Sequence, residues 1–403
     1  MREPAGWLAG DRDPGRFPYA EVMAQFHRTG KHFADKDLLV QLDRARRTAP
    51  ADHGPGRRLR DFLDVALDKF DGRYDYQTYL GLRLLPLPQV VGGPGRDDEV
   101  VRREHDELIL QLVADAIGFE TAAAGGTTDL LPVQRPAPQL VEKRCRLAVR
   151  AVAAQTRDQA AGQTPDPIAA TARLCEAAAA RRTDEQRWAL TVSMQPVDRI
   201  HDEYLFIRVL QGYESTFAVL AAELGQAVDD LDGARAADAA RRLRFSADLL
   251  DRSAPLFSLM ATVRAESFQA FRVYTEGASA IQSRSYKRVE ALCRTPRQDR
   301  LDSAAYRSVP EVRDEVLGGR RSLDEVYRSA VASGPDRRLL DEAMTQFATA
   351  LLRWRRTHHR IAVRMLGTRP GTGYTEGTPY LAAVRDIPVF SPGADPAEGG
   401  QPS

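Results

Sequence analysis

Apolar residues recur at spacings of three and four over most of the chain, and strictly alternating apolar and polar runs are scarce. That spacing places apolar side chains on one face of an α-helix. The pattern therefore predicts an all-α protein. Helices are expected at residues 36–48, 57–70, 75–85, 98–122, 139–160, 167–182, 196–225, 232–251, 254–275, 280–293, 322–333 and 336–366.

The remaining segments carry signals for loops. Residues 1–36 mix Gly, Pro and charged residues and are expected to be irregular. Clusters of Gly and Pro break the helical pattern between residues 86 and 95 and again between 125 and 138. The tail at 392–403, PGADPAEGGQPS, is expected to be disordered because it has too few large apolar side chains to bury.

One predicted helix carries a histidine within its apolar stripe. The stripe consists of Leu351, Trp354, His358, Ile361 and Met365. His359 lies about 100° further round the helix and is expected to face solvent with the arginines. A buried imidazole requires a hydrogen-bonding partner or a metal such as haem iron, and a satisfied core histidine is the commoner case. The spacing alone leaves both interpretations open.

Composition narrows the class of protein. The chain has 403 residues, with 57 Lys and Arg against 56 Asp and Glu, for a net charge of +1. That balance argues against a general nucleic-acid or anionic-membrane binder. No run of 18 apolar residues predicts a membrane span, and the N-terminus lacks a signal peptide's apolar core. Three widely spaced cysteines suit a reducing compartment, so a cytoplasmic protein is expected.

Four strings, taken in their order along the chain, resemble the tryptophan 2,3-dioxygenase family. They are YQTYLGL at 76–82, HDEYLFIRVLQGYE at 201–214, FRVYTEGASAIQS at 271–283, and WRRTHHRIAVRMLG at 354–367 followed by GTG at 371–373. The resemblance leaves residues 1–70 as an N-terminal extension. It implies an oxygenase domain at 71–391, interrupted by a helical insertion at about 86–195.

The resemblance implies a helical-bundle haem protein. In the family, the histidine matching His358 is the proximal ligand of haem b iron. The partners implied are an aromatic amino acid and O2, with no nucleic acid or membrane. The implied reaction inserts O2 across the indole C2–C3 bond of L-tryptophan or a derivative, giving an N-formylkynurenine-type product.

The same resemblance assigns residues to the substrate pocket. Phe206 would line the aromatic pocket, and Arg272 would hold the substrate carboxylate, which a planar guanidinium fits bidentately. Thr372 would contact the ammonium and carboxylate groups, and Ser279 is a further catalytic candidate. Each has a structural interpretation too: Phe206 as core, Arg272 as a salt bridge, and the Gly371–Gly373 loop as a helix cap.

The first string implies an assembly. Tyr76, Tyr79 and Leu80 match family residues that reach into the pocket of a neighbouring subunit. If these residues reach into a neighbouring subunit here, the protein is a homo-oligomer, and the family resemblance implies a homotetramer. The alternative is that these residues belong to a core helix within one chain.

The chain departs from the family pattern at position 210, where a distal histidine is expected and Leu210 stands. Leu210 cannot accept a hydrogen bond from the indole N–H, a loss of about 0.5–1.5 kcal/mol. Tyr374 and Glu376 also replace smaller loop residues of the family. These changes favour an alternative: a haem-dependent mono-oxygenase or hydroxylase acting on a tryptophan or tyrosine derivative in specialised metabolism.

The sequence leaves two further classes of function open. A metal phosphohydrolase would use the pairs His105-Asp106 and His201-Asp202, but adjacent residues on a helix diverge by about 100°. A non-catalytic helical module that has lost haem would explain Leu210 and the insertion. Retention of His358, Arg272 and Thr372 argues against that module.

Overall fold

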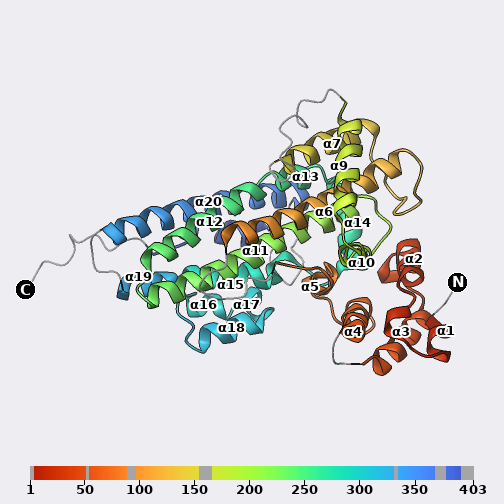
Figure 1. Cartoon of the computed structure of the whole chain (residues 1–403), viewed down its shortest axis with the longest axis horizontal. Coiled ribbons are helices and arrows are strands. Elements are labelled where there is room, and N and C mark those ends of the chain that lie inside the picture. Colours follow the sequence, from red (N-terminus) through yellow and green to blue (C-terminus); the bar gives the residue numbers. More distant parts are fainter. Residues whose placement is uncertain are drawn as a thin grey trace, which may run out of the picture.

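The computed structural model describes residues 4–50, 54–88, 97–153, 166–330, 335–367 and 378–391. Over these residues the regular structure is helical, and the β contact found there is an isolated parallel bridge between Val133 and Ile200. The predicted all-α fold is therefore confirmed. The long helices run side by side along the longest axis of the molecule (Figure 1).

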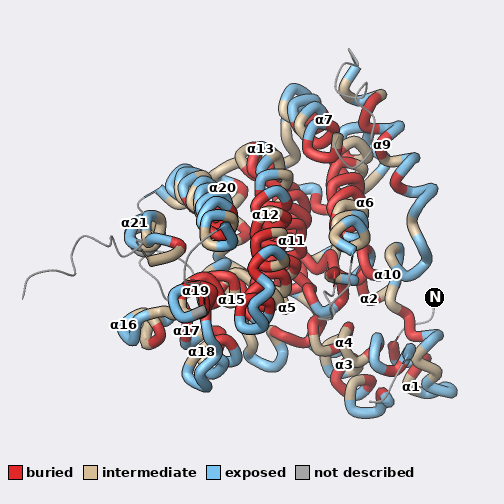
Figure 2. Tube along the Cα trace, turned by 60° about the vertical axis from the view of Figure 1, so that its left-hand side comes forward, coloured by how far each residue is buried: buried red, intermediate tan, exposed pale blue. Residues whose placement is uncertain are grey.

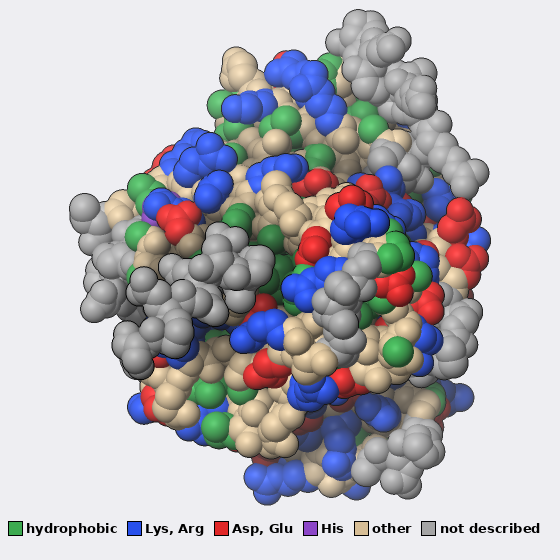
Figure 3. All heavy atoms as spheres, turned by 90° about the vertical axis from the view of Figure 1, so that its left-hand side faces the viewer, with side chains coloured by type: hydrophobic (Ala, Val, Ile, Leu, Met, Phe, Trp, Pro, Cys, Tyr) green, Lys and Arg blue, Asp and Glu red, His purple; other side chains and the backbone are tan. Residues whose placement is uncertain are grey.

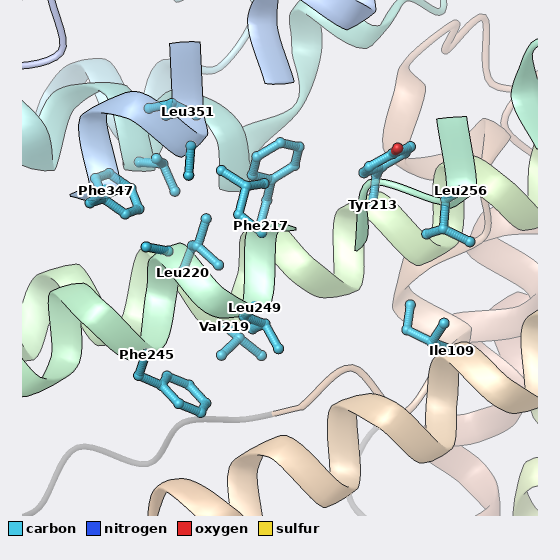
Figure 4. Packing of buried hydrophobic residues seen from close by; sticks show 14 of the residues in the cluster. Ile109, Tyr213, Phe217, Val219, Leu220, Phe245, Leu249, Leu256, Phe347 and Leu351 are labelled. Carbon is cyan, nitrogen blue, oxygen red and sulfur yellow. The ribbon is translucent and has the colours of Figure 1, made fainter. Parts of the chain in front are cut away.

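Four long helices form the central bundle. They are α6 (Asp98–Ala124), α11 (Asp202–Asp232), α12 (Ala236–Ser253) and α20 (Pro335–Leu366). Helix α11 packs against α6 and α12, and α12 packs against α20. Figure 4 shows Phe217 and Leu220 of α11 lying toward Phe347 and Leu351 of α20. These side chains belong to the largest apolar core of the described chain.

Helix α11 differs from its neighbours because it is buried nearly all round (Figure 2). Its sequence is apolar on several faces, which is typical of a helix enclosed by other helices. Helices α7 (Pro138–Ala151) and α20 instead keep an exposed outer face. Side chains on α11 can therefore reach an interior site, whereas much of α20 faces solvent.

Shorter helices surround the bundle. They are α5 (Tyr76–Tyr79), α9 (Pro167–Arg181), α10 (Asp184–Val192), α13 (Leu256–Met260), α14 (Ala265–Arg272), α15 (Arg284–Cys293), α16 (Gln298–Leu301), α17 (Ala304–Arg307), α18 (Pro310–Leu317), α19 (Leu323–Ala330) and α21 (Thr378–Arg385). Helix α10 begins with a capping box in which Thr183 and Gln186 each bond the other's backbone N–H.

Two predicted helices are interrupted. The predicted helix at 75–85 is α5 followed by a 3-10 turn at Leu82–Leu84, because Gly81 adopts a φ of 58° between them. The predicted helix at 254–275 is divided into α13 and α14. There the backbone N–H of Arg264 donates to the Asp202 carboxylate, 2.9 Å away, in place of a helical bond. That contact joins residues far apart in sequence.

The expectation that residues 1–36 are irregular is wrong. This segment forms α1 (Pro4–Ala9) and α2 (Tyr19–Thr29), which pack with α3 (Lys36–Thr48) and α4 (Pro55–Ala66) around a second apolar core. Edge-to-face contacts among Trp7, Phe17 and Phe62 fill it. The short helices are stable because tertiary packing buries their aromatic side chains.

A buried ionic cluster joins α6 and α7 to the start of α11. Arg144 of α7, fully buried, donates to Glu120 of α6 at 2.5 Å and contacts Asp202 of α11 at 2.9 Å. His201 lies 3.2 Å from Glu120, and Arg264 lies 2.9 Å from Asp202. Two buried carboxylates therefore share two arginines and a histidine, so their burial is compensated.

The outer surface carries both signs of charge. Figure 3 shows basic and acidic side chains interspersed over one face of the molecule. Among the described residues, no helix combines the length and apolarity needed to cross a membrane. Cys145, Cys175 and Cys293 are all free thiols.

Candidate functional site

A deep cavity opens between α11, α14, α15 and α20, with α5 closing one side. The cavity volume is about 200 Å³. Its walls are mainly aromatic and aliphatic, with a few polar groups, as in small-molecule and cofactor sites. Of the residues assigned from the sequence, the cavity is lined by Tyr76, Tyr79, Phe206, Leu210, Arg272, Ser279 and His358.

His358 lies on the cavity wall formed by α20. Its ring stacks on Trp354, with centroids 5.0 Å apart and planes 19° apart. Burial, with a smaller contribution from His359, lowers the pKa of His358 to about 4. The imidazole is therefore neutral at pH 7 and keeps a lone pair, the form that binds a metal. Among the described residues, no side chain or backbone group hydrogen-bonds its ring nitrogens.

Trp354, on which the His358 ring stacks, is itself held by other aromatic side chains. Its ring contacts those of Phe217, Phe257 and Tyr286 at centroid distances of 4.9–5.6 Å. Its buried Nε1 has no hydrogen-bond acceptor among the described residues. An aromatic box of this kind fixes the orientation of the imidazole, and His358 lines the cavity together with it.

The expectation that His359 faces solvent is wrong. His359 is half-buried and lines the cavity, and its Nδ1 lies 3.5 Å from a guanidinium nitrogen of Arg385 on α21. Helix α21 covers this side of α20, which a helical period cannot show.

The part of the cavity wall that α11 and α14 form is also aromatic. Phe206 packs against Phe268 and Phe271 of α14, with ring centroids 5.4 and 5.2 Å apart. Leu210, one turn further along α11, lines the same space. A flat aromatic ligand can therefore stack or pack edge-on against this wall.

Arg272 ends α14 at the edge of the aromatic wall. Its guanidinium carbon lies 5.7 Å from the Phe268 ring centroid, and the side chain lines the cavity. Ser279 lies nearby on the loop before α15, where its backbone N–H donates to Gln282. Thr372 and the Gly371–Gly373 loop, together with Tyr374 and Glu376, lie outside the described residues.

Helix α5 closes the cavity of its own chain. Tyr76 and Tyr79 are both buried and line the cavity. The backbone N–H of Tyr76 donates to Gln282 at 3.0 Å, and the Tyr79 hydroxyl donates to Glu203 at 3.2 Å. Leu80 is buried beneath them, away from the cavity lining, and its carbonyl accepts from Gln211 at 2.7 Å.

A cationic cluster that the sequence did not reveal lines another part of the cavity. Lys287, Arg300 and Arg355 surround Glu290, with N–O distances of 2.7, 2.9 and 3.4 Å. Burial opposes ionisation of Glu290, but the three cations outweigh it and lower its pKa to about 2. Lys287, Arg300 and Arg355 thus place three basic side chains in the cavity wall. No local motif indicates this cluster, since its members come from three separate segments.

Glu214 is the second functional group that sequence reasoning missed. It lies within the quoted string at 201–214, one turn after Leu210, and lines the cavity. Among the described lining residues, it is the one carboxylate. Helical spacing from Phe206 and Leu210 could have indicated it, because residues four apart share a face.

The described lining is compatible with haem. The apolar and aromatic walls suit a macrocycle, and His358 presents a neutral imidazole that lacks a hydrogen-bond partner among the described residues. The basic side chains of Lys287 and Arg355 in the lining suit a cofactor bearing carboxylates. These three requirements are met by one cavity.

The two His-Asp pairs do not form a metal site. The Nε2 atom of His105 lies at hydrogen-bond distance, 3.0 Å, from the Thr216 hydroxyl, and Asp106 forms an ion pair with Arg252. His201 and Asp202 belong to the ionic cluster around Arg144. Among the described residues, no three His, Cys, Asp or Glu side chains are grouped to hold a metal ion. The phosphohydrolase alternative therefore loses its structural basis.

Comparison with known proteins agrees with the four strings. The chain is 25% identical to a tryptophan 2,3-dioxygenase of Polaromonas sp. (strain JS666) over 240 residues, which cover 50% of this chain and 81% of that relative. It is 27% identical to one of Anaeromyxobacter dehalogenans (strain 2CP-C) over 239 residues, 50% of this chain and 88% of the relative. No family model matches the chain. With this similarity, the order of the strings and the all-α fold, the chain is a divergent relative of the tryptophan 2,3-dioxygenases.

Proposed function

We propose that this chain is a haem-dependent oxygenase that acts on an aromatic amino acid, with O2 as co-substrate. The observation that carries the proposal is the neutral imidazole of His358, stacked on Trp354 at the wall of an aromatic cavity that also holds Arg272. By similarity to the relatives, the reaction is insertion of O2 across the indole C2–C3 bond of tryptophan or a derivative, giving an N-formylkynurenine-type product.

The chain's own residues would bind, orient and enclose the reactants. His358 would hold the iron of haem b, which when bound would supply the activation of O2. Phe206 would hold the aromatic ring by packing, and Arg272 would hold the amino-acid carboxylate. Tyr76 and Tyr79 would close the cavity and limit entry of water. Ser279 would lie at its rim, and Thr372 would contact the ammonium group.

A hydroxylase is the second candidate, and Leu210 favours it. The residue lies on the cavity wall and offers no hydrogen bond to an indole N–H. A site without that bond can accept a tyrosine or a modified tryptophan. The candidate outcomes then differ in the number of oxygen atoms transferred.

Product analysis tests the proposal. The purified, haem-loaded chain is incubated with 18O2 and L-tryptophan or L-tyrosine, and the products are examined by mass spectrometry. Two labelled oxygen atoms in one product indicate dioxygenation, and one indicates hydroxylation. The His358→Ala variant serves as the control. A chain that neither binds haem nor oxidises either amino acid would refute the proposal.

Arg272→Ala is expected to raise the KM for the amino-acid substrate by roughly 10- to 100-fold, because a hydrogen bond to a charged group contributes about 1.5–3 kcal/mol. Arg272→Lys should recover part of the loss, since an ammonium keeps the charge but cannot bind a carboxylate bidentately. Steady-state kinetics with the haem spectrum as a loading check measure this. Arg353→Ala, which removes an exposed arginine of α20, is the matched control. Unchanged kinetics for Arg272→Ala would remove this residue from the site.

The placement of α5 bears on assembly. The family resemblance implies a homotetramer in which Tyr76, Tyr79 and Leu80 serve a neighbouring subunit. In the structure, both tyrosines line the cavity of the chain that carries them. We propose that each chain holds a complete cavity, whether or not the chains associate. Activity per chain that falls on dilution, in step with dissociation seen by sedimentation, would contradict this.

The packing of residues 1–70 and of the insertion at about 86–195 suggests what these two regions contribute to the cavity. Residues 1–70 form an extension whose helices dock on the chain near 194–197, where His27 contacts the Met194 carbonyl at 2.8 Å and the Lys31 N–H donates to Pro196 at 2.8 Å. The insertion at about 86–195 contributes α6 to the bundle core. We propose that both regions brace α5 and α11 around the cavity.

A further inference from the structure

Glu214 occupies an unusual place in the cavity. It is 3% exposed, lies on α11 one turn beyond Leu210, and is the one carboxylate in the described lining. A buried carboxylate in an aromatic cavity is costly unless polar groups satisfy it. The structure supplies two such groups, from elements far apart in sequence.

The two groups are the hydroxyls of Tyr76 on α5 and Ser283 at the start of α15, which lie close enough to the Glu214 carboxyl to lower its pKa. Ser283 Oγ already accepts from the Tyr286 N–H at 3.1 Å, so its hydroxyl hydrogen is available to donate. A carboxylate has about four acceptor positions, so two neighbouring hydroxyls leave capacity for a donor from the cavity.

The direction of the side chain brings Glu214 toward the position of the absent histidine. Side chains on an α-helix point back toward its N-terminus, so Glu214 extends over the turn that carries Leu210. Leu210 provides no polar atom there. Glu214 and Leu210 both line the cavity, so the carboxyl is a polar group on the side of α11 that carries Leu210.

The surroundings of the Glu214 carboxyl place its pKa close to neutral pH. Burial raises the pKa of Glu214 to about 7, and the hydrogen bonds from Ser283 and Tyr76 oppose that rise. The cations Arg272 and Lys287 line the same cavity. Near neutral pH the carboxyl therefore titrates, and its ionised form accepts a hydrogen bond from a donor more strongly than its neutral form does.

We infer that Glu214, which lines the cavity together with Tyr76, accepts a hydrogen bond from the ring of the substrate and thereby selects aromatic amino acids that carry a ring donor, a phenolic O–H or an indole N–H. This inference rests on the proposed function. It assigns ring recognition to Glu214 in a chain where position 210 cannot provide it. A site built around a buried acceptor rejects analogues that leave it unpaired.

Equilibrium binding to the haem-loaded chain tests the inference without turnover. The probes are two matched pairs, L-tyrosine with L-phenylalanine and L-tryptophan with 1-methyl-L-tryptophan. The wild-type chain should bind the donor-bearing member of at least one pair roughly tenfold more tightly. Glu214→Met, which keeps the length but removes the acceptor, should abolish that preference by weakening the donor-bearing probe alone. Glu214→Gln should retain part of it.

Tyr76→Phe provides a second variant if Glu214→Met does not fold. It keeps the buried ring and removes the hydroxyl, so the preference should fall several-fold while the donor-lacking probes bind as before. Equal weakening of both members of a pair, a preference that survives Glu214→Met, or a wild-type chain that distinguishes neither pair would overturn the inference. Loss of the oxygenated product with the binding preference intact would instead contradict the proposed function alone.

Discussion

His358→Ala is expected to abolish haem binding by the purified chain, with loss of the Soret band and of iron at one equivalent per chain. The residue presents a neutral imidazole to the cavity, and no group of three or more His, Cys, Asp or Glu side chains among the described residues could hold a metal ion elsewhere. Because removing an outer partner of a metal ligand already costs roughly 10- to 100-fold in affinity or activity, removal of the ligand itself should cost more.

The neighbouring histidine provides the control. His359→Ala removes an imidazole from the same turn of α20, where Arg385 is its contact, and should leave the spectrum unchanged. Added imidazole should restore part of the Soret band in His358→Ala, since alanine leaves a space beside Trp354 of about the size of the lost ring. Full iron content in His358→Ala, or equal loss in both variants, would show that His358 is not the ligand.

Arg144→Ala is expected to lower the free energy of unfolding by about 3–5 kcal/mol, because it leaves Glu120 and Asp202 buried without their shared cation. Burial by itself raises the pKa of Asp202, and the arginines Arg264 and Arg144 hold it below its usual range. Removing one arginine therefore exposes the remaining carboxylates to the cost of burial. Urea unfolding monitored by circular dichroism measures the loss.

Arg353→Ala is the matched control for stability. Arg353 pairs with Asp251 at 2.9 Å, but its side chain is 60% exposed, so the pair should contribute at most about 1 kcal/mol. The two substitutions remove the same side chain, and they differ in burial. A loss below about 1 kcal/mol for Arg144→Ala would mean that the cluster around Arg264 and His201 compensates fully.

Helical periodicity was most informative where the helices are long and buried. The predicted helix at 336–366 corresponds to α20, and the stripe through Trp354, His358 and Met365 does face the interior. It failed where short elements depend on contacts with distant segments. The helices of residues 1–36 are an example, since their aromatic side chains are buried by packing with other elements such as α4 and α10.

The candidate site shows the same division. Phe206, Arg272 and His358 could be selected from the strings that contain them, because each string is local. The roles of Glu214 and of the cationic cluster around Glu290 could not be assigned from the sequence. Their meaning depends on which groups from other elements face them, such as Tyr76, 138 positions earlier in the chain.

The sequence by itself determined the all-α class, the interior face of α20 and the likeness to the tryptophan 2,3-dioxygenases. Those features depend on spacing within one helix or on the order of short strings. Only the tertiary structure decided that α5 closes the cavity of its own chain, that His359 lies under α21, and that Glu214 faces the space beside Leu210. The physical reason is that a cavity is formed by side chains of several helices, whose relative positions depend on packing between distant segments rather than on local spacing.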